Sequence, residues 1–316
     1  PTSLSETGDD SYVYFKKQAI FAVIGVAAML FISKIDYRFW KKFYKIAYIA
    51  SIILLLMVLI PGIGRSAGGA RRWINLGIQF QPSELAKIGL IIFYASYLTD
   101  HKEELKDFKK GFVKPLLYLV PVVLILILVQ DHLSATIIIV LVVGIMMLMA
   151  GVRLKYFATV GTGVAVAGAA GLYAMAKFTS KGAFRIARIT SFLNPWADKQ
   201  GDGWQVIQSL YAIGSGGLFG VGLGQSKQKY LYISEPHTDF IFAVAGEEYG
   251  FMGCCSIVIL LLAISVECIR MSLRAKDLSG KIICCGMASI ISLQSFLNIC
   301  VATGIAPNTG TPLPFV

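Results

Sequence analysis

Residues 115–151 read PLLYLVPVVLILILVQDHLSATIIIVLVVGIMMLMAG, and this stretch decides the fold. Two long apolar runs flank the polar turn Gln130-Asp131-His132, and neither run alternates apolar and polar residues as a barrel strand would. Runs approaching about 20 apolar residues can cross the hydrocarbon core of a bilayer as helices. The stretch therefore predicts two membrane-spanning helices joined by a short turn.

The same apolar character extends along the chain, which has 316 residues, of which 56% are hydrophobic and only 15% are charged. A soluble domain of this size needs more charge to cover its surface. We therefore predict an all-α fold, a polytopic transmembrane helical bundle that forms a single membrane domain over residues 1–316. The eight spans are predicted at residues 18–34, 46–63, 84–98, 115–130, 133–151, 155–176, 250–269 and 281–303.

Lysines and arginines predict the orientation of these spans. They crowd the connections 34–45, 99–114, 153–155 and 270–281, whereas the short connections between the other span ends hold few of them. Because basic residues concentrate in cytoplasmic loops, we place these connections in the cytoplasm. The starting segment is then outside, and we expect a further span before it.

The long stretch 177–249 then also lies outside, as an extracytoplasmic loop. It carries the basic residues Lys177, Lys181, Arg185, Arg188, Lys199, Lys227 and Lys229. Long loops are largely exempt from the charge rule, so these residues do not reverse the orientation. They suit either anionic headgroups or a specific anionic ligand. We assign the net charge of +11 to loop anchoring and such a ligand rather than to nucleic acid.

The cysteines do not indicate a metal site. They lie within or beside two apolar segments near the end of the chain, as Cys254, Cys255, Cys268, Cys284, Cys285 and Cys300. Their spacing does not suit zinc, so we interpret them as small packing residues.

Glycines loosen the backbone in two segments, and the first of them also carries charge. The first runs from Gly68 to Glu84 and contains Arg71, Arg72 and Trp73; its Pro82-Ser83-Glu84 predicts a helix start with Lys87 one turn later. The second is the glycine run 214–224, which suits either a close backbone approach to a ligand or tight packing against a helix.

Polar residues also mark three other places. Asp239 stands where the long loop meets apolar sequence, where it could act as a base or cap the next helix. Glu247 and Glu248 follow two turns later and could be functional or could snorkel to the interface. Gln294 and Asn298 share one face of the last span, as polar contacts between helices or as part of a site.

In order, these segments resemble the SEDS family (shape, elongation, division and sporulation), nearer its FtsW and SpoVE branch than RodA. The matching stretches are GGARRWINLG, FQPSELAK, RIARITSFLNPW, GSGGLFGVGLGQSKQKYLY, SEPHTDFIFAVAGEEYG and PNTGTPLPF, across about residues 60–316. Family members have ten spans with both ends cytoplasmic. The resemblance therefore implies that the first and last spans are lacking here.

The resemblance implies a peptidoglycan glycosyltransferase that polymerises lipid II into glycan strands on the outer face of the cytoplasmic membrane, in cell division or sporulation. Undecaprenyl pyrophosphate leaves and the donor carbon inverts, so a base is needed on the acceptor side. Asp239 aligns with the acid that the family treats as catalytic. Candidate substrate-binding residues are Arg71, Arg72, Trp73, Lys87, Arg185, Arg188, Lys227, Lys229, Glu235 and His237. Among them, the basic side chains can stabilise the leaving pyrophosphate.

The same chemistry admits a divalent cation, Mg²⁺ or Mn²⁺, although the sequence assigns no metal ligand. The resemblance implies a class B penicillin-binding protein, a transpeptidase, as partner beside other membrane proteins of division or elongation. Two other functions stay open at this stage. One is a transporter that flips lipid II, with Lys87, Glu267, Gln294 and Asn298 along its path. The other is a scaffold that only docks the transpeptidase.

Overall fold

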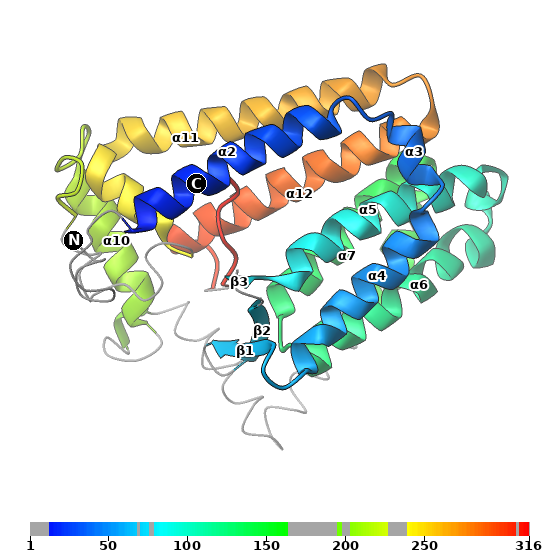
Figure 1. The fold of residues 1–316 in the computed structure, drawn as a ribbon, viewed down its shortest axis with the longest axis horizontal. Coiled ribbons are helices and arrows are strands. Elements are labelled where there is room, and N and C mark those ends of the chain that lie inside the picture. The colour runs from blue at the N-terminus through cyan, green and yellow to red at the C-terminus, as the bar shows by residue number, and fades with distance from the viewer. Residues whose placement is uncertain are drawn as a thin grey trace.

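The computed structural model describes residues 13–67, 70–75, 79–163, 195–197, 203–226, 239–307 and 310–315. Helices dominate this part of the chain, and the long ones share roughly one direction (Figure 1). The α-helices are α2 Val13–Ile32, α3 Tyr37–Lys41, α4 Tyr44–Leu56, α5 Pro82–Asp100, α6 Lys114–Leu124, α7 Leu133–Ala150, α10 Trp204–Gly216, α11 Ile241–Arg274 and α12 Leu278–Ala302. Shorter 3₁₀ or π turns are η1 Met57–Leu59, η2 Lys102–Lys106, η3 Phe108–Val113, η4 Ile125–Val129 and η5 Pro195–Ala197.

The helical fold class is confirmed, and so is its membrane character. Within the described part of the chain, four helical stretches are long and apolar enough to cross a membrane: Phe108–Val129, Leu133–Ala150, Ile241–Arg274 and Leu278–Ala302. The predicted spans 18–34 and 46–63 coincide with the shorter apolar helices Gln18–Ile32 and Tyr44–Leu59. The predicted span 84–98 coincides with α5. Of the predicted span 155–176, only the first part, to residue 163, lies within the described residues, and it is helical.

Local sequence explains where several helices begin and end. Pro82 opens α5 and Glu84 lies in its first turn, as predicted. Gly151, with φ 107°, ends α7 in the left-handed conformation that glycine adopts most easily. The carboxylate of Asp277 caps α12 by accepting from the Gly280 N–H.

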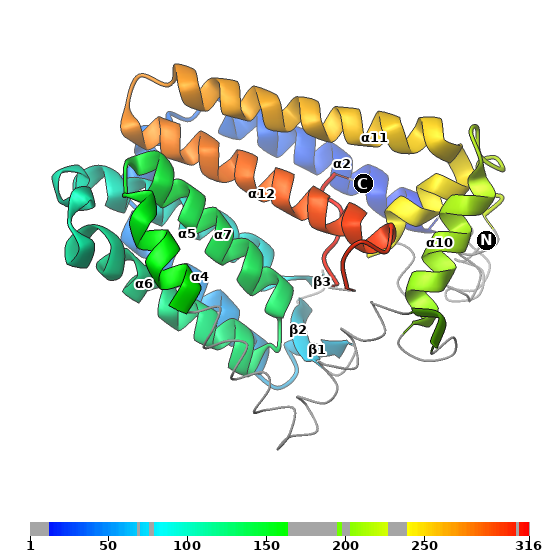
Figure 2. The same cartoon turned by 180° about the vertical axis from the view of Figure 1, so that it is seen from behind.

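The helix α12 lies at the centre of the packing. It contacts α5 and α7 on one side and α11 on the other, and Figure 2 shows it between these groups. The larger apolar core joins α4, α5, α6 and α7 to the first half of α12, with Tyr94, Val122, Met146 and Ile282 fully buried. Smaller apolar clusters join α10 and α11 to the second half of α12. All six cysteines are free thiols on α11 and α12, as expected of packing residues.

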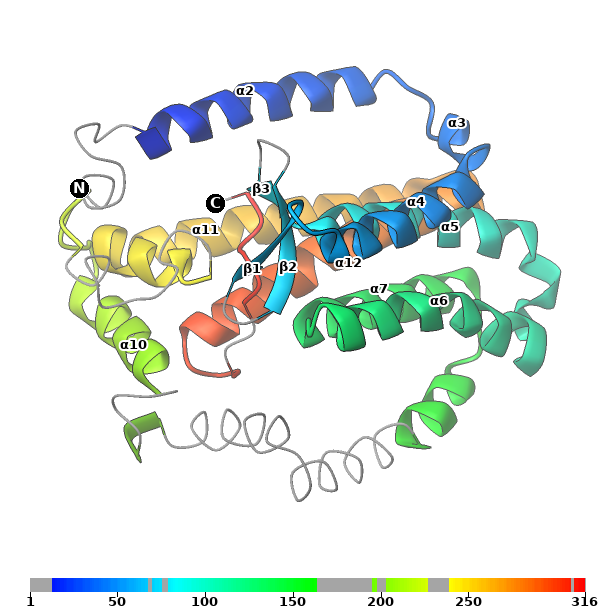
Figure 3. The same ribbon diagram turned by 60° about the horizontal axis from the view of Figure 1, so that its bottom comes forward.

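A small antiparallel sheet, which the sequence analysis did not predict, caps one end of the bundle (Figure 3). Its strands are β1 Gly64–Ala67, β2 Ala70–Asn75 and β3 Gln79–Phe80, in the order β1-β2-β3. Trp73 lies opposite Arg65, and Ile74 lies opposite Phe80. Because Ile74 is fully buried, β2 is anchored to the helices and its side chains hold fixed directions.

Regular structure enters the predicted external loop 177–249, whose location outside the membrane stays a prediction. The helix α10 lies inside this range, and α11 begins at Ile241 rather than near 250. Gly250 interrupts α11 with φ 68° and ψ −165°, so residues 241–249 form a separate helical segment before the long one. The apolar run beyond residue 250 gave no indication of this first segment.

One end of the bundle, called the motif end, holds the sheet, the turn 130–132, Asp239 and residues 310–315. Arg72 of the sheet binds the turn, and Asn298 of α12 binds the backbone of both Asp239 and Thr311. The clasp end holds the connections 33–36 and 275–277 and the end of α5. Tyr37 Oη donates to Asp277 Oδ1 there, and Lys41 Nζ lies 2.7 Å from Asp100 Oδ1.

Candidate active site

Arg72 reaches from β2 to the turn between η4 and α7. Its Nε donates to the Gln130 carbonyl at 3.3 Å and its Nη2 to the Asp131 carbonyl at 2.7 Å. The pairing of β1 with β2 shifts register at this point: Arg65 pairs with Trp73 and Ser66 pairs with Arg71, so Arg72 is the extra residue of a β-bulge. A bulge changes the direction of a side chain, and the neighbouring Arg71 is exposed. Trp73 is half-buried on β2. The two arginines, which the sequence treats alike, therefore occupy different environments.

Asp239 and Arg72 meet beside Gly310. A Cβ placed on Gly310 would lie 3.5 Å from Asp239 Oδ2 and 3.8 Å from Arg72 Nη1. Gly310 has φ 63°, and a side chain there would both strain the backbone and crowd the two charged groups. The carboxylate and the guanidinium predicted to act on one substrate are thus neighbours of the same glycine.

The backbone around Asp239 is held by Asn298 of α12. The Asn298 Nδ2 donates to the Asp239 carbonyl at 2.9 Å and to the Thr311 carbonyl at 2.8 Å. The residue at the cap position of α11 is Phe240, one residue after Asp239, and a capping role for Asp239 stays a prediction. The amide of Asn298 fixes Asp239 and the 310–315 segment together.

Lys87 forms a buried polar group with its neighbours. Its Nζ lies 2.8 Å from Glu84 Oε2 and donates to Gln294 Oε1 at 2.7 Å. The Lys87 side chain is 3% exposed, whereas that of Glu84 is 39% exposed. Gln294 in turn donates to the Pro312 carbonyl at 3.1 Å. The predicted i,i+3 pair is confirmed, and it is connected to the same closing segment as Asp239.

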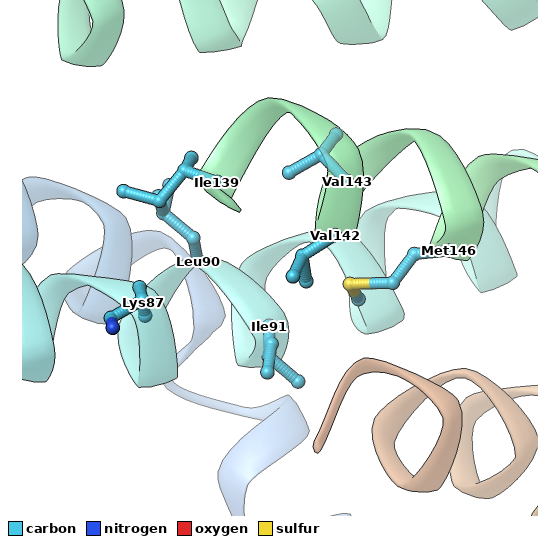
Figure 4. Close-up of a pocket in the computed structure, with 7 residues that line it drawn as sticks. All are labelled: Lys87, Leu90, Ile91, Ile139, Val142, Val143 and Met146. Carbon is cyan, nitrogen blue, oxygen red and sulfur yellow. The ribbon is translucent and has the colours of Figure 1, made fainter. Parts of the chain in front are cut away.

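Below Lys87, the interior turns apolar. Figure 4 shows a small gap between α5 and α7 with the Lys87 side chain at its rim, and Gly286 of α12 packs against two of its side chains. The gap is lined by Lys87, Leu90, Ile91, Ile139, Val142, Val143 and Met146. The charged site therefore stops at Lys87, about one helical turn inside α5.

The turn that receives Arg72 has unusual features of its own. Asp131 has φ 47°, a conformation uncommon outside glycine. His132 is 1% exposed, and neither of its ring nitrogens has a hydrogen-bond partner among the described residues. Burial, together with the positive charges of Arg72 and Lys87, lowers the pKa of the His132 imidazole to about 3. His132 was not among the residues that the sequence analysis selected, because a short polar turn suits any helical hairpin.

The glycine run 214–224 packs tightly against α11. Of the two interpretations of this run, the structure therefore favours helix packing over a close approach to a ligand. A Cβ on Gly216 would lie 2.0 Å from the Gly246 oxygen, and one on Gly220 would lie 2.1 Å from the Glu248 oxygen. The Val221 N–H donates to the Glu247 carbonyl at 2.9 Å. The Glu247 side chain is buried and accepts from Ser226 Oγ, so it does not snorkel.

Several predicted site residues lie outside the described residues, so their roles stay predictions. They are Arg185, Arg188, Lys227, Lys229, Glu235 and His237. Among the residues that are described, no group of three or more His, Cys, Asp or Glu side chains could hold a metal ion.

These features define a class of protein: a polytopic helical membrane protein with a charged site at one end of its bundle. The chain belongs to the FtsW/RodA/SpoVE family of cell cycle proteins, whose family model matches residues 1–316. The predicted family is therefore confirmed.

Individual relatives agree with this assignment. The chain is 43% identical over 309 residues to stage V sporulation protein E of Bacillus subtilis (strain 168), covering 98% of this chain and 82% of the relative. It is 40% identical over 308 residues to a probable peptidoglycan glycosyltransferase FtsW of Geobacter sp. (strain M18), covering 97% and 82%. The chain thus spans about four fifths of the length of these relatives.

Solved structures share the fold. One comes from work on the structural coordination of polymerization and crosslinking by a peptidoglycan synthase complex, with a TM-score of 0.79 and 27% identity over 99% of this chain and 85% of that chain. Another is the Rod shape determining protein RodA of Thermus thermophilus, with a TM-score of 0.66 and 26% identity over 99% and 83%.

Proposed function

We propose that this protein is a peptidoglycan glycosyltransferase that polymerises lipid II, with Asp239 as its catalytic base. Relatives at 38–40% identity carry the name probable peptidoglycan glycosyltransferase FtsW, which supports the reaction. The observation that carries the site is the meeting of Asp239 and Arg72 at Gly310. It puts a proton acceptor and a fixed positive charge where one substrate can contact both.

The reaction needs both groups. The 4-hydroxyl of the acceptor sugar attacks the anomeric carbon of the donor, and the new glycosidic bond forms as the bond to the pyrophosphate oxygen breaks. Asp239 takes the hydroxyl proton, and undecaprenyl pyrophosphate leaves with the electron pair. Because attack and departure are on opposite faces, the anomeric carbon inverts.

Positive charge stabilises the pyrophosphate as it leaves. Arg72 is suited to this because Gln130 and Asp131 accept its Nε and Nη2 hydrogen bonds, which fix its plane while Nη1 faces the Gly310 side. Lys87 is 3% exposed and bound to Glu84 and Gln294, so in this conformation its charge acts from behind the site. A direct contact between Lys87 and the substrate remains a prediction.

A divalent cation fits these residues in a limited way. Glu84 is engaged by Lys87, whereas the Asp239 carboxylate lies beside Gly310 together with Arg72 and could ligate Mg²⁺ or Mn²⁺. Such an ion commonly uses one or two carboxylates, phosphate oxygens and water. When bound, it would supply charge to the pyrophosphate, while Asp239, Arg72 and Gly310 would still set the position of the sugar.

The proposal also includes the location and the partner. Basic connections at the clasp end favour a cytoplasmic position for it, so the motif end faces outward from the bacterial cytoplasmic membrane. A structural relative belongs to a peptidoglycan synthase complex that coordinates polymerization and crosslinking. By that likeness the partner is a class B penicillin-binding protein, and the names SpoVE and FtsW support a role in sporulation or division.

The transport hypothesis gains little support from the described residues. Gln294 and Asn298 bind backbone carbonyls at the motif end, and Lys87 binds Gln294. Glu267 pairs with Arg270 at 3.4 Å on an exposed face of α11. These side chains therefore do not line a shared path through the bundle.

The test is polymerisation of labelled lipid II by the parent protein with its transpeptidase partner, compared with Asp239→Asn. The substitution keeps the shape of the side chain but removes the base, so we expect a rate loss of about 100-fold or more with unchanged thermal stability. Arg65→Ala, at an exposed arginine of β1 that is not among the candidate substrate-binding residues, is the matched control and should keep most of the activity. Normal polymerisation by a folded Asp239→Asn protein would move the base elsewhere, and lipid II flipping without polymer would favour transport.

A further inference from the structure

His132 is the buried polar residue at the motif end that the proposed mechanism does not use. Its imidazole is 1% exposed, and both ring nitrogens lack a partner among the described residues. The neighbouring Gln130 is fully buried, and its Oε1 also lacks a partner within the described part of the chain. Gln130 is partly satisfied, because its Nε2 donates to the Leu55 carbonyl at 2.9 Å, whereas the His132 ring makes no hydrogen bond within the described residues. Both side chains lie on the turn whose carbonyls hold Arg72.

The fold does not need the ring of His132. Its backbone N–H donates to the Leu126 carbonyl at 2.8 Å, and its carbonyl accepts from Thr136 Oγ1 at 2.9 Å. These bonds are available to any residue at position 132. A buried ring without hydrogen bonds costs stability, and an apolar side chain of similar size would avoid that cost. The polar ring therefore requires an explanation other than folding.

The chemical character of the ring indicates what it could bind. With its pKa lowered to about 3, the imidazole is neutral near pH 7 and offers one donor and one acceptor. A sugar hydroxyl or an acetamido group uses both. A phosphate is better served by the cations Arg72 and Lys87, which already lie nearby. Arg72 and Lys87 therefore suit a charged group of the substrate, whereas His132 suits a neutral polar group.

We propose that His132 is a substrate-contacting residue that binds a hydroxyl or acetamido group of a sugar beside the Asp239 and Arg72 pair. The proposal rests on the proposed glycosyltransferase function and adds a sugar-binding group to it. Because the ring is closed off in this conformation, the contact forms when the site opens to admit the sugar. Gln130, whose Oε1 is also unsatisfied, would face the same region from two residues away.

The experiment compares His132→Leu and His132→Gln in the protein with its partner. For each variant, thermal stability and kcat/KM for lipid II are measured. We expect His132→Leu to melt at or above the parent temperature while kcat/KM falls about 10- to 100-fold, since one neutral hydrogen-bonding group is lost. His132→Gln, which keeps a donor and an acceptor, should recover part of the activity. If the ring served only the fold, His132→Leu would melt below the parent temperature and its folded fraction would keep the parent kcat/KM.

The matched control is Tyr97→Phe, which removes another buried hydroxyl without a partner among the described residues, on α5 near the clasp end. It should keep both stability and kcat/KM. Parent-like kcat/KM in His132→Leu, or failure of both His132 variants to fold, would overturn the proposal.

If the parent itself forms no polymer, the glycosyltransferase proposal fails, and the role of His132 is then decided by binding. Added lipid II should raise the melting temperature of the parent more than that of His132→Leu. Equal shifts would overturn the sugar contact.

Discussion

Arg71 and Arg72 are adjacent in the sequence, yet a single strand gives them different tasks. A β-bulge at Arg72, where the pairing of β1 with β2 shifts register, accompanies its contact with the turn 130–132, whereas Arg71 is exposed. A similar contrast separates Glu84 from Lys87, which form one ion pair but differ in exposure, 39% against 3%. At the residue scale, burial rather than charge type decides how much each side chain matters for stability.

This contrast predicts an asymmetric response of the Glu84 and Lys87 pair. Glu84→Ala leaves the buried Lys87 ammonium without its carboxylate, which should destabilise the protein by about 3 kcal/mol. Lys87→Met leaves a carboxylate that water can reach, so its cost should be smaller, about 1–2 kcal/mol. Thermal unfolding in detergent measures both. Equal losses, or a larger loss for Lys87→Met, would show that the ammonium is not the buried partner.

At the element scale, the apolar runs predicted where the membrane helices lie, because burial in lipid requires long uncharged segments. The elements that the sequence missed depend on tertiary contacts. The strands β1 to β3 are short and carry Arg65, Arg71 and Arg72, so they have no apolar alternation to reveal them. The first segment of α11 contains Glu247, whose buried carboxylate accepts from Ser226 Oγ, while the glycine run packs against the neighbouring backbone.

The candidate site could also be predicted only in part from the sequence. The motifs indicated Asp239, Arg72 and Lys87, and the structure brings Asp239 and Arg72 together through Gly310. What the sequence could not indicate was that His132 is buried without partners among the described residues. That property depends on how the turn 130–132 is enclosed by the rest of the fold and not on the residues of the turn themselves.

The break in α11 predicts a sharp difference between two glycines. Gly250 has φ 68°, and a Cβ there would lie 2.3 Å from the Gly220 nitrogen. Gly250→Ala should therefore destabilise the protein by about 3 kcal/mol from backbone strain alone, with the clash adding to it. Gly214 of α10 has open space at its Cβ position, so Gly214→Ala should be neutral or stabilise by up to about 1 kcal/mol. Thermal unfolding of the two variants checks this order, and equal effects would mean that the break can straighten.

At the scale of the whole molecule, α2 differs from the other long helices. Each of its side chains whose exposure is described is exposed, and Figure 3 shows the helix set apart from the bundle. The connection that follows it is attached at the clasp end, where Tyr37 Oη donates to Asp277 Oδ1 and Lys41 pairs with Asp100. Asp277 also caps α12, so this contact joins α2 to the central helix of the molecule.

The hydrogen bond between Tyr37 and Asp277, called the clasp, predicts a pH range within which α2 is held in place. The hydrogen bond from Tyr37 lowers the pKa of the Asp277 carboxyl, and the same bond raises the pKa of the Tyr37 phenol. The Asp277 contribution is present above the ordinary carboxyl pKa and is lost as pH falls through the lowered value. The Tyr37 contribution is present below the ordinary phenol pKa and is lost as pH rises through the raised value. The clasp should therefore hold between about pH 4 and pH 10.

Spin labels on α2 and α11 can follow the distance between these two helices in nanodiscs. The labels are introduced as unnatural residues because the native cysteines are free. The distance distribution should be narrow inside the pH window and broad outside it, whereas Tyr37→Phe should be broad at every pH because the donor is gone. Tyr156→Phe removes a phenol that donates to the Lys106 carbonyl at 2.9 Å, outside the contact that holds α2, and should behave like the parent. A narrow distribution in Tyr37→Phe would mean that lipid or the remaining contacts fix α2, and the clasp would then not determine its position.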